Sequence, residues 1–142
     1  MTENNLTPRE VTNLKRTDEW AEQWNIPTGS SETLVNEYYA DNTEIHAILQ
    51  SSRPMLKAGD DKAKLMAFEK AGAKAMKSRT MTFIKKIAQG DTVAVQVEVD
   101  YVTSDGRAGV DWFAAFLTFD DDGRITVDHT FMRNRPFSEL KG

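Results

Sequence analysis

Acidic side chains in the second half of the chain are the clearest candidates for catalytic groups. Asp100 and Asp111 lie in two runs with the alternation of β-strands, separated by Asp105-Gly106. If Asp105-Gly106 forms a two-residue turn, Asp100 falls opposite Asp111 on one face of a sheet. Two carboxylates in a low-dielectric cavity do not both ionise cheaply, so one keeps its proton near neutral pH. We therefore predict that Asp100 and Asp111 are catalytic and share acid–base work.

Two further acidic residues are predicted on the same face. Glu98 has the parity of Asp100 in its strand, and an even-numbered loop through the DDDG turn places Asp128 there too. We expect both to tune the catalytic pair. The alternative is that this face is open to solvent and that its acids only aid solubility. The opposite, valine-rich face is the more hydrophobic one, which favours that alternative.

The two histidines are alternative site residues. His129 directly follows Asp128 and could act as a proton shuttle. Alternation turns His129 away from Asp128, so an interface or structural role is the other interpretation, and the same choice applies to His46. No metal site is expected, because these histidines and the acids do not converge on one point. Asp120–Gly123 (DDDG) lacks the loop length and distal glutamate of an EF-hand.

Helix-capping residues and the spacing of apolar residues indicate the helices and strands that would position these side chains. The capping box at Thr7, with proline next, begins a helix whose stripe holds Val11. The predicted helices run from Thr7 to Ile26, from Ser30-Ser31 to Asp41-Asn42, and from Asp60 or Asp61 to about Lys77. The predicted strands are residues 43–49, 79–88, 92–104, 107–119 and 124–133.

Length and composition bound the architecture. A chain of 142 residues fits one domain, residues 1–142, with flexible tails at 1–6 and 134–142. The element order predicts an α+β fold with three helices on one face of a curved sheet. Without cysteine there is no disulfide framework, thiolate metal site or cysteine nucleophile.

Charge and hydropathy limit the partners. The net charge is −4, so nothing favours nucleic acid or an anionic membrane as a partner. The polar N-terminus lacks the apolar run of a signal peptide, and no stretch is long enough to span a membrane. We expect a soluble, cytoplasmic protein without a cofactor.

The segments WAEQWN, LVNEYYADNTEIHAIL and FDDDGRITVDHTFM, in this order of elements, resemble the nuclear transport factor 2-like superfamily. The resemblance is to its SnoaL-like and ketosteroid isomerase-like branch and covers nearly the whole chain. It implies a cone-shaped cavity between the helices and a curved mixed or antiparallel sheet. The residues that ketosteroid isomerases use are not retained, since the matching positions hold Trp20, Ala47 and Ala115.

The resemblance also implies which side chains line the cavity. Glu98, Asp100, Asp111 and Asp128 fall on cavity-lining strand positions of the family. The expected substrate-binding residues are Trp20, Tyr39, Phe113, Ala115, Leu117, Thr130 and Met132. For Trp20 and Tyr39, plain core packing is the alternative.

Together these observations predict a cofactor-free SnoaL-like enzyme that isomerises, dehydrates, cyclises or hydrolyses a small apolar molecule. The alternative is a non-catalytic ligand-binding or association module of the same fold. If the acids face inward, the valine-rich face is left outside. We expect that face to be buried in a homodimer formed through the sheet.

Overall fold

The chain folds as three helices over a five-stranded mixed sheet, which confirms the predicted α+β class. This computed structural model describes residues 5–26, 31–48 and 61–133; most of both predicted tails, residues 1–4 and 134–142, lies outside them. The elements are α1 (Pro8–Asn25), α2 (Ser31–Tyr38), β1 (Tyr39–Ile48), α3 (Lys62–Ala75), β2 (Met76–Gln89), β3 (Thr92–Thr103), β4 (Ala108–Phe119) and β5 (Ile125–Arg133).

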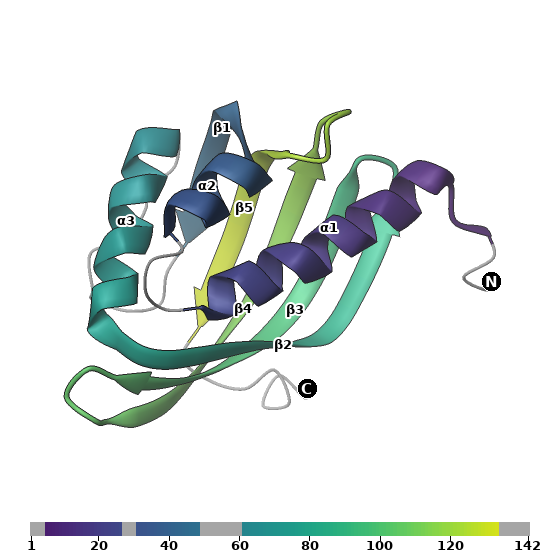
Figure 1. Ribbon diagram of the computed structural model, residues 1–142. Helices are drawn as coiled ribbons and strands as arrows, with labels where there is room; N and C mark the ends of the chain where they lie inside the picture. The colour runs from purple at the N-terminus through teal and green to yellow at the C-terminus, as the bar shows by residue number, and fades with distance from the viewer. Residues whose placement is uncertain (1–4, 27–30, 49–60, 134–142) are drawn as a thin grey trace.

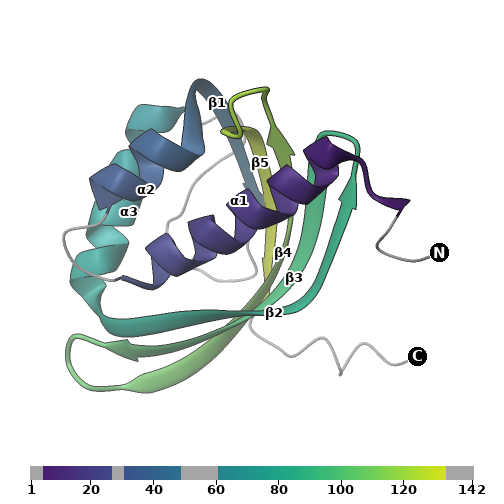
Figure 2. The ribbon, with the colours of Figure 1, turned by 45° about the vertical axis from the view of Figure 1, so that its right-hand side comes forward.

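The sheet has the order β1-β5-β4-β3-β2, with β1 parallel to β5 and every other neighbouring pair antiparallel. All three helices lie on one face, and α1 runs obliquely across it (Figure 1). The strands curve around this side, as the turned view shows (Figure 2). We call the face under the helices the concave face and the opposite one the convex face.

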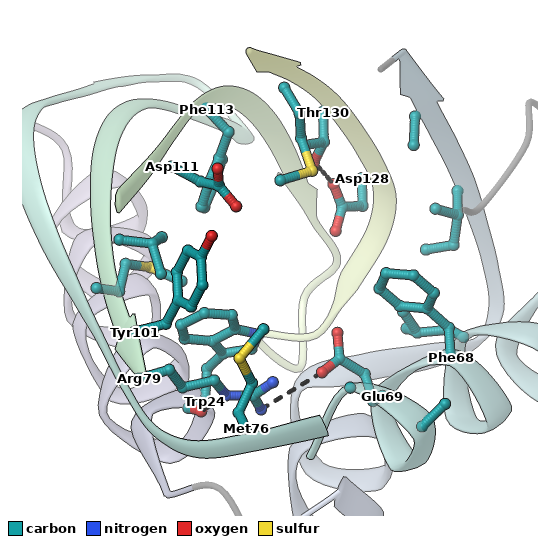
Figure 3. A pocket seen from close by; sticks show the side chains of 18 of the residues that line it. Trp24, Phe68, Glu69, Met76, Arg79, Tyr101, Asp111, Phe113, Asp128 and Thr130 are labelled. Atoms are coloured by element: carbon teal, nitrogen blue, oxygen red, sulfur yellow. Dashed lines mark hydrogen bonds and ion pairs between the residues drawn. The ribbon is translucent and has the colours of Figure 1, made fainter. Parts of the chain in front are cut away.

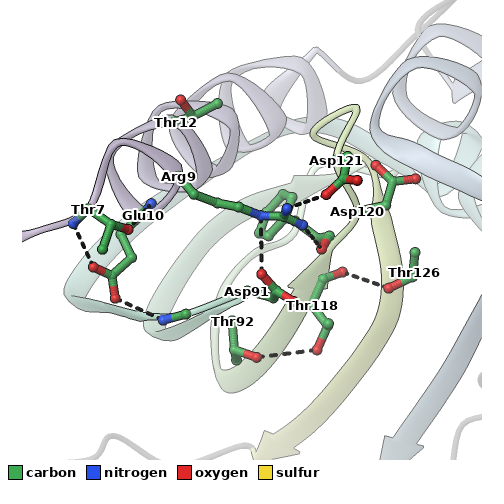
Figure 4. A network of polar contacts seen from close by, with 12 residues as sticks. Thr7, Arg9, Glu10, Thr12, Asp91, Thr92, Thr118, Asp120, Asp121 and Thr126 are labelled. Carbon is green, nitrogen blue, oxygen red and sulfur yellow. Dashed lines mark hydrogen bonds and ion pairs between the residues drawn. The ribbon is translucent and has the colours of Figure 1, made fainter.

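Helix α1 is fixed to two turns of the sheet at its N-terminus (Figure 4). The predicted capping box is present, with reciprocal hydrogen bonds between Thr7 and Glu10. The Arg9 guanidinium contacts Asp91 in the β2–β3 turn and Asp121 in the β4–β5 turn, and also donates to the Phe119 carbonyl. One arginine therefore joins three segments that are far apart in sequence.

The buried side of α1 differs from the predicted stripe. Val11 is 53% exposed, whereas Asn13 and Thr17 are buried together with Trp20. Thr17 satisfies its hydroxyl by donating to the Asn13 carbonyl one turn earlier, at 2.8 Å. A hydrophobic pattern does not reveal Thr17 as a buried residue, because its hydroxyl is satisfied within the helix.

Helix α2 ends earlier than predicted, and β1 follows it without a loop. Tyr38 is the last helical residue and Tyr39 the first of the strand, whereas the helix was expected to end at Asp41-Asn42. Thr43 donates to the Ile125 carbonyl, which helps to hold β1 beside β5. The earlier strand start places Tyr39 on the sheet, where its side chain is buried.

The turn between β3 and β4 has three residues, not the predicted two. Thr103 and Arg107 close it through a backbone bond of 2.8 Å, and Gly106 has φ +90°. This is the geometry in which a glycine takes the left-handed position of a three-residue hairpin loop. Ser104 also donates its N–H to the Ala75 carbonyl, which ties the turn to the end of α3.

This extra residue shifts the register of β3 by one. Asp100 pairs with Val110, and Val99 pairs with Asp111. Because side chains alternate along a strand, the shift turns Val99 inward and Asp100 outward. The predicted Asp100–Asp111 pair is therefore wrong.

The turn between β4 and β5 also has three residues, but the predicted faces there are confirmed. Asp120 and Arg124 close the turn, and the pairing then slips by one residue between Thr118 and Phe119. The turn and the irregularity offset each other, so Leu117 pairs with Asp128 and the side chain of Asp128 is on the predicted face. Asp128 therefore shares the concave face with Asp111.

Candidate active site

A cavity of about 390 Å³ lies between the helices and the concave face, within the size range of small-molecule sites. Its lining is mainly apolar. Of the predicted site residues, the cavity brings together Trp20, Tyr39, Asp111, Phe113, Asp128, Thr130 and Met132. Residues that the sequence analysis did not assign to the site also line it, notably Trp24, Glu69, Arg79 and Tyr101.

Asp128 is a buried acid of the cavity whose carboxylate is held by hydrogen bonds from two side chains. It is 6% exposed, and its two carboxylate oxygens accept from different side chains. The Tyr39 hydroxyl donates to Oδ2 at 2.8 Å, and the Thr130 hydroxyl donates to Oδ1 at 2.5 Å. Trp20 Nε1 in turn donates to the Tyr39 hydroxyl at 3.1 Å. Helix α1 and strands β1 and β5 thus meet in one hydrogen-bond chain.

The direction of this chain is fixed at one end. An indole nitrogen only donates, so the Tyr39 oxygen accepts from Trp20 and gives its own proton to Asp128. A threonine hydroxyl can donate or accept, so Thr130 can reverse when Oδ1 takes a proton. Oδ1 is therefore the oxygen at which Asp128 can gain and lose a proton while every hydrogen bond of this series is kept.

Burial shifts the titration of these groups. It raises the pKa of Asp128, although the hydrogen bonds from Thr130 and Tyr39 act in the opposite direction. It also raises the pKa of Tyr39 well above its usual value, and the nearby negative charge of Asp128 adds to the effect. Tyr39 therefore stays neutral near neutral pH, and burial makes the charged form of Asp128 less favourable than in water.

A second polar cluster joins α3 to β2 across the cavity (Figure 3). Glu69 Oε2 lies 3.5 Å from Arg79 Nη2, and both side chains are buried. Arg79 Nε donates to the Trp24 carbonyl at 2.7 Å, and its guanidinium lies 4.0 Å from the centre of the Trp24 ring. Burial raises the pKa of Glu69 to about 7, with Arg79 opposing the shift and Asp128 adding to it.

Several predicted site residues lie outside the cavity lining. Ala115 and Leu117 are on the concave face but are packed in the core, at 1% and 0% exposure. Asp100 is exposed on the convex face, where Glu98 also lies and accepts a bond from Trp112. The predicted cavity positions of Asp100 and Glu98 are wrong, because of the three-residue β3–β4 turn.

The two histidines also lie on the convex face. His46 and His129 are cross-strand neighbours with ring centroids 5.6 Å apart, and His129 stacks on Phe131 at 4.7 Å. Neither lines the cavity, so the structural interpretation is the one that their positions support. Within the described residues, no three histidine or acidic side chains form a group suited to a metal ion.

Asp111 and Tyr101 point toward one another at another part of the cavity (Figure 3). Tyr101 pairs with Gly109 on the neighbouring strand. A Cβ on Gly109 would lie 2.4 Å from Tyr101 Cζ and Oη. The glycine is therefore what allows the tyrosine ring to lie across β4.

Replacing Gly109 by alanine is expected to displace the Tyr101 ring and destabilise the protein by about 1–3 kcal/mol through overpacking. Chemical denaturation measures the loss, and aromatic NMR shifts report the ring. Gly72→Ala is the control, because a Cβ there meets Arg79 Nη1 at an ordinary 3.7 Å. Equal effects of the two substitutions would contradict this account of Gly109.

The sequence profile that matches this chain is that of the SnoaL-like domain, over residues 18–127. The chain belongs to the SnoaL-like domain family. No curated protein sequence matches this SnoaL-like domain significantly. The profile match confirms the resemblance to SnoaL-like proteins seen in the sequence, and solved structures described as NTF2-like or SnoaL-like share the fold.

Three solved structures illustrate the range of this fold. AusH from Aspergillus nidulans has 11% identity and a TM-score of 0.75, over 92% of this chain and 89% of that one. A Jannaschia protein described as a SnoaL-like polyketide cyclase has 16% identity and a TM-score of 0.70, over 90% of each chain. An LEH-like epoxide hydrolase from M. tuberculosis has 10% identity and a TM-score of 0.68, over 89% and 86%. At these identities the SnoaL-like domain shares their fold, and its chemistry must be argued from its own cavity.

Among the residues described, no helix of the SnoaL-like domain is both long and apolar enough to cross a bilayer.

Proposed function

We propose that this SnoaL-like domain is an enzyme that moves a proton on a small, largely apolar molecule bound in the cavity. In this proposal Asp128 is the acid–base group, in place of the Asp100–Asp111 pair that was predicted from the sequence. The observation that carries the proposal is the hydrogen-bond chain Trp20–Tyr39–Asp128–Thr130 inside an apolar cavity. Isomerisation, dehydration, cyclisation and hydrolysis all include such a step.

The electrostatics of Asp128 support this role. A general acid–base group works best when its pKa lies near the working pH. Burial raises the pKa of Asp128 in that direction, and Thr130 can follow a proton on Oδ1 by reversing its own hydrogen bond. Asp111 lines the same cavity and is a second candidate for proton transfer.

The cavity sets the substrate class. Aromatic and aliphatic side chains from both helices and strands form most of its wall, including Trp20, Phe68, Phe113 and Met132. Such a surface favours flat, apolar molecules, while the few polar groups fix their orientation. We therefore expect a hydrophobic ring system with a small number of polar atoms.

Hydrogen exchange of a ketone tests the proposal without knowledge of the natural substrate. β-Tetralone is a bicyclic ketone whose α-protons exchange with D₂O through an enolate. We expect the protein to accelerate this exchange, measured by proton NMR, over buffer of the same pH. Binding without acceleration would instead favour the non-catalytic ligand-binding alternative.

The convex face supports a separate proposal, that two copies associate through the sheet. A cross-strand row runs from His46 through His129, Phe116 and Ala94 to Ile87. Phe116 and Ile87 are 48% and 55% exposed, although both are large and hydrophobic. Water contact with such a row is unfavourable, and a second copy would remove it.

Phe116→Glu is expected to shift the protein from dimer to monomer, because a charge would be desolvated at the centre of the paired faces. Analytical ultracentrifugation measures the mass. Val11→Glu adds the same charge to an exposed position on α1 and is expected to leave the mass unchanged. A monomeric wild-type protein at micromolar concentration would contradict the dimer.

A further inference from the structure

Carboxyl groups outnumber basic groups on the cavity wall. Among the described residues that line the cavity, Glu69, Asp111 and Asp128 carry carboxyl groups, and Arg79 carries the one guanidinium. Arg79 Nε donates to the Trp24 carbonyl, and the guanidinium lies 4.0 Å from the centre of the Trp24 ring. Its Nη2 is buried and faces Glu69. The polar group that a bound molecule meets at this part of the wall is therefore the Glu69 carboxylate.

Glu69 is a buried side chain that lacks a hydrogen-bond donor within the described residues. It is 8% exposed and lines the cavity from α3. Its ion-pair partner, Arg79 Nη2, is 3.5 Å away, at the outer limit of hydrogen-bond length and without hydrogen-bond geometry. Buried carboxylates are normally hydrogen-bonded, because leaving them unsatisfied is costly. The Glu69 oxygens are thus acceptors for a donor on a bound molecule.

A second carboxylate faces Glu69 across the cavity. Asp128 and Glu69 point toward one another from β5 and α3 (Figure 3), and the negative charge of Asp128 contributes to the raised pKa of Glu69. Tyr39 and Thr130 each donate one hydrogen bond to Asp128, which leaves about two of its four lone-pair positions unused. Two carboxylates in a space of low dielectric constant repel each other, and a cation between them removes that repulsion.

Aromatic rings complete a surface that suits a cation with an apolar body. Phe68 precedes Glu69 on α3, and Tyr101 and Phe113 line the cavity from the sheet. The face of an aromatic ring attracts a positive charge, as the position of Arg79 over the Trp24 ring shows within this protein. The same rings bury apolar surface.

We propose that the ligand of this cavity is a hydrophobic amine, whose ammonium group binds between the Glu69 and Asp128 carboxylates while its apolar body packs on the aromatic wall. The inference rests on the proposed function, because it names the substrate class of that site. Glu69 anchors the ligand, and Asp128 keeps the acid–base role. A carboxylate ligand would add a third negative charge, and a hydroxyl group donates one hydrogen bond where an ammonium group donates three.

Binding of an ammonium group would be coupled to the titration of Glu69. The charged or titratable groups that act on Glu69 are Arg79 on β2 and Asp128 on β5, the Tyr39 hydroxyl on β1 is within electrostatic range, and Asp111 lines the cavity from β4. Burial raises the pKa of Glu69 to about 7, so about half of the protein carries a proton there at pH 7. A bound cation favours the ionised form. Binding therefore releases up to about half a proton from Glu69 at that pH.

Three naphthalenes of nearly equal size, each with one substituent at the same ring position, test the proposal: aminomethylnaphthalene, hydroxymethylnaphthalene and ethylnaphthalene. The amine is protonated at neutral pH, and the other two are uncharged. We expect the amine to bind about ten- to a hundredfold more tightly than ethylnaphthalene, as hydrogen bonds between charged groups would give. Quenching of tryptophan fluorescence measures the affinities, because Trp20 and Trp24 line the cavity. Equal affinity of the amine and the alcohol would overturn the choice of a cation.

Proton release gives a readout that does not depend on any variant. Titration calorimetry in two buffers with different enthalpies of ionisation measures the number of protons released when a probe binds. Release with the amine and none with ethylnaphthalene supports the proposal. A bound amine that releases no proton near neutral pH would overturn its contact with Glu69.

The informative variant is Glu69→Gln, which has nearly the shape of the protonated side chain and cannot ionise. Its preference for the amine over ethylnaphthalene is expected to fall by about tenfold or more, and its proton release to disappear, while ethylnaphthalene binds as in the wild type. Glu32→Gln is the matched control, because Glu32 is an exposed residue of α2 that pairs with Lys70 outside the cavity. Retention of the amine preference by Glu69→Gln would overturn the role of Glu69.

The outcomes separate this inference from the proposed function. Binding of the two uncharged probes with no preference for the amine overturns the cationic ligand alone, and the exchange of β-tetralone still tests the acid–base role of Asp128. Failure of all three naphthalenes to bind overturns the cavity as a binding site, and with it both proposals.

Discussion

Asp128→Asn is expected to reduce the exchange of β-tetralone by about 10²–10⁴-fold, the usual contribution of a general acid–base group. Asparagine has nearly the same shape and can still accept from Tyr39 at its carbonyl oxygen, so the fold should persist. It cannot take up a proton. Proton NMR gives the exchange rate, and circular dichroism shows that the variant is folded.

The matched control is Asp100→Asn, the same change on the same sheet but on the exposed convex face. Its exchange rate is expected to equal that of the wild type. Equal loss in both variants would show that the rate does not depend on the cavity, and full activity of Asp128→Asn would reject Asp128 as the acid–base group.

Tyr39→Phe separates positioning from catalysis. The Tyr39 hydroxyl lowers the pKa of Asp128 by donating to its carboxylate, so removal of the hydroxyl raises that pKa. The acid side of the exchange profile should therefore move to higher pH. Trp20 Nε1 also loses its acceptor, at a cost of about 1–3 kcal/mol in stability. An unchanged pH profile would argue against a direct Tyr39–Asp128 contact.

Stability is expected to fall as the pH rises through the titration of Glu69. Burial raises its pKa from 4.5 to about 7. Between these values the folded protein binds more protons at this site than the unfolded chain, so the contribution is fully present below about pH 4.5 and is lost by about pH 7. The loss is about 3 kcal/mol in order of magnitude. Asp128 acts in the same direction, because burial raises its pKa as well.

Glu69→Gln isolates this effect. The difference in unfolding free energy between wild type and Glu69→Gln should change by about 3 kcal/mol over that pH range, measured by urea denaturation at a series of pH values. Glu32→Gln breaks an exposed ion pair with Lys70 and is expected to change stability by less than about 1 kcal/mol. A constant difference for Glu69→Gln would mean that Glu69 titrates in the folded protein as it does in the unfolded chain.

Sequence patterns predicted the element types well where local signals decide them. The capping box starts α1 at the expected residue, and Asp61 caps α3 as one of the two predicted choices. Turn signals also separated the last three strands correctly. They could not set the loop length, because an Asp-Gly pair suits both a two-residue turn and a three-residue turn with glycine at its end. That difference of one residue misplaced Asp100 and Glu98.

The polar cluster of the cavity was missed for a different reason. Glu69 lies four residues after Leu65 and four before Ala73, and all three are buried. A charged residue on the apolar stripe of α3 was therefore the available signal. Arg79 offered no such signal, because its partners Trp24 and Glu69 come from two helices whose placement depends on the whole fold.

The Ser104–Gly106 loop also affects how relatives of this protein should be compared. Inserting or deleting one residue there would exchange the inward and outward side chains along an entire strand, without altering the backbone path of the sheet. At identities of 10–16% to the structures described above, a column-by-column alignment does not reveal such a change. Functional positions in this family should therefore be transferred only after hairpin lengths have been matched in three dimensions.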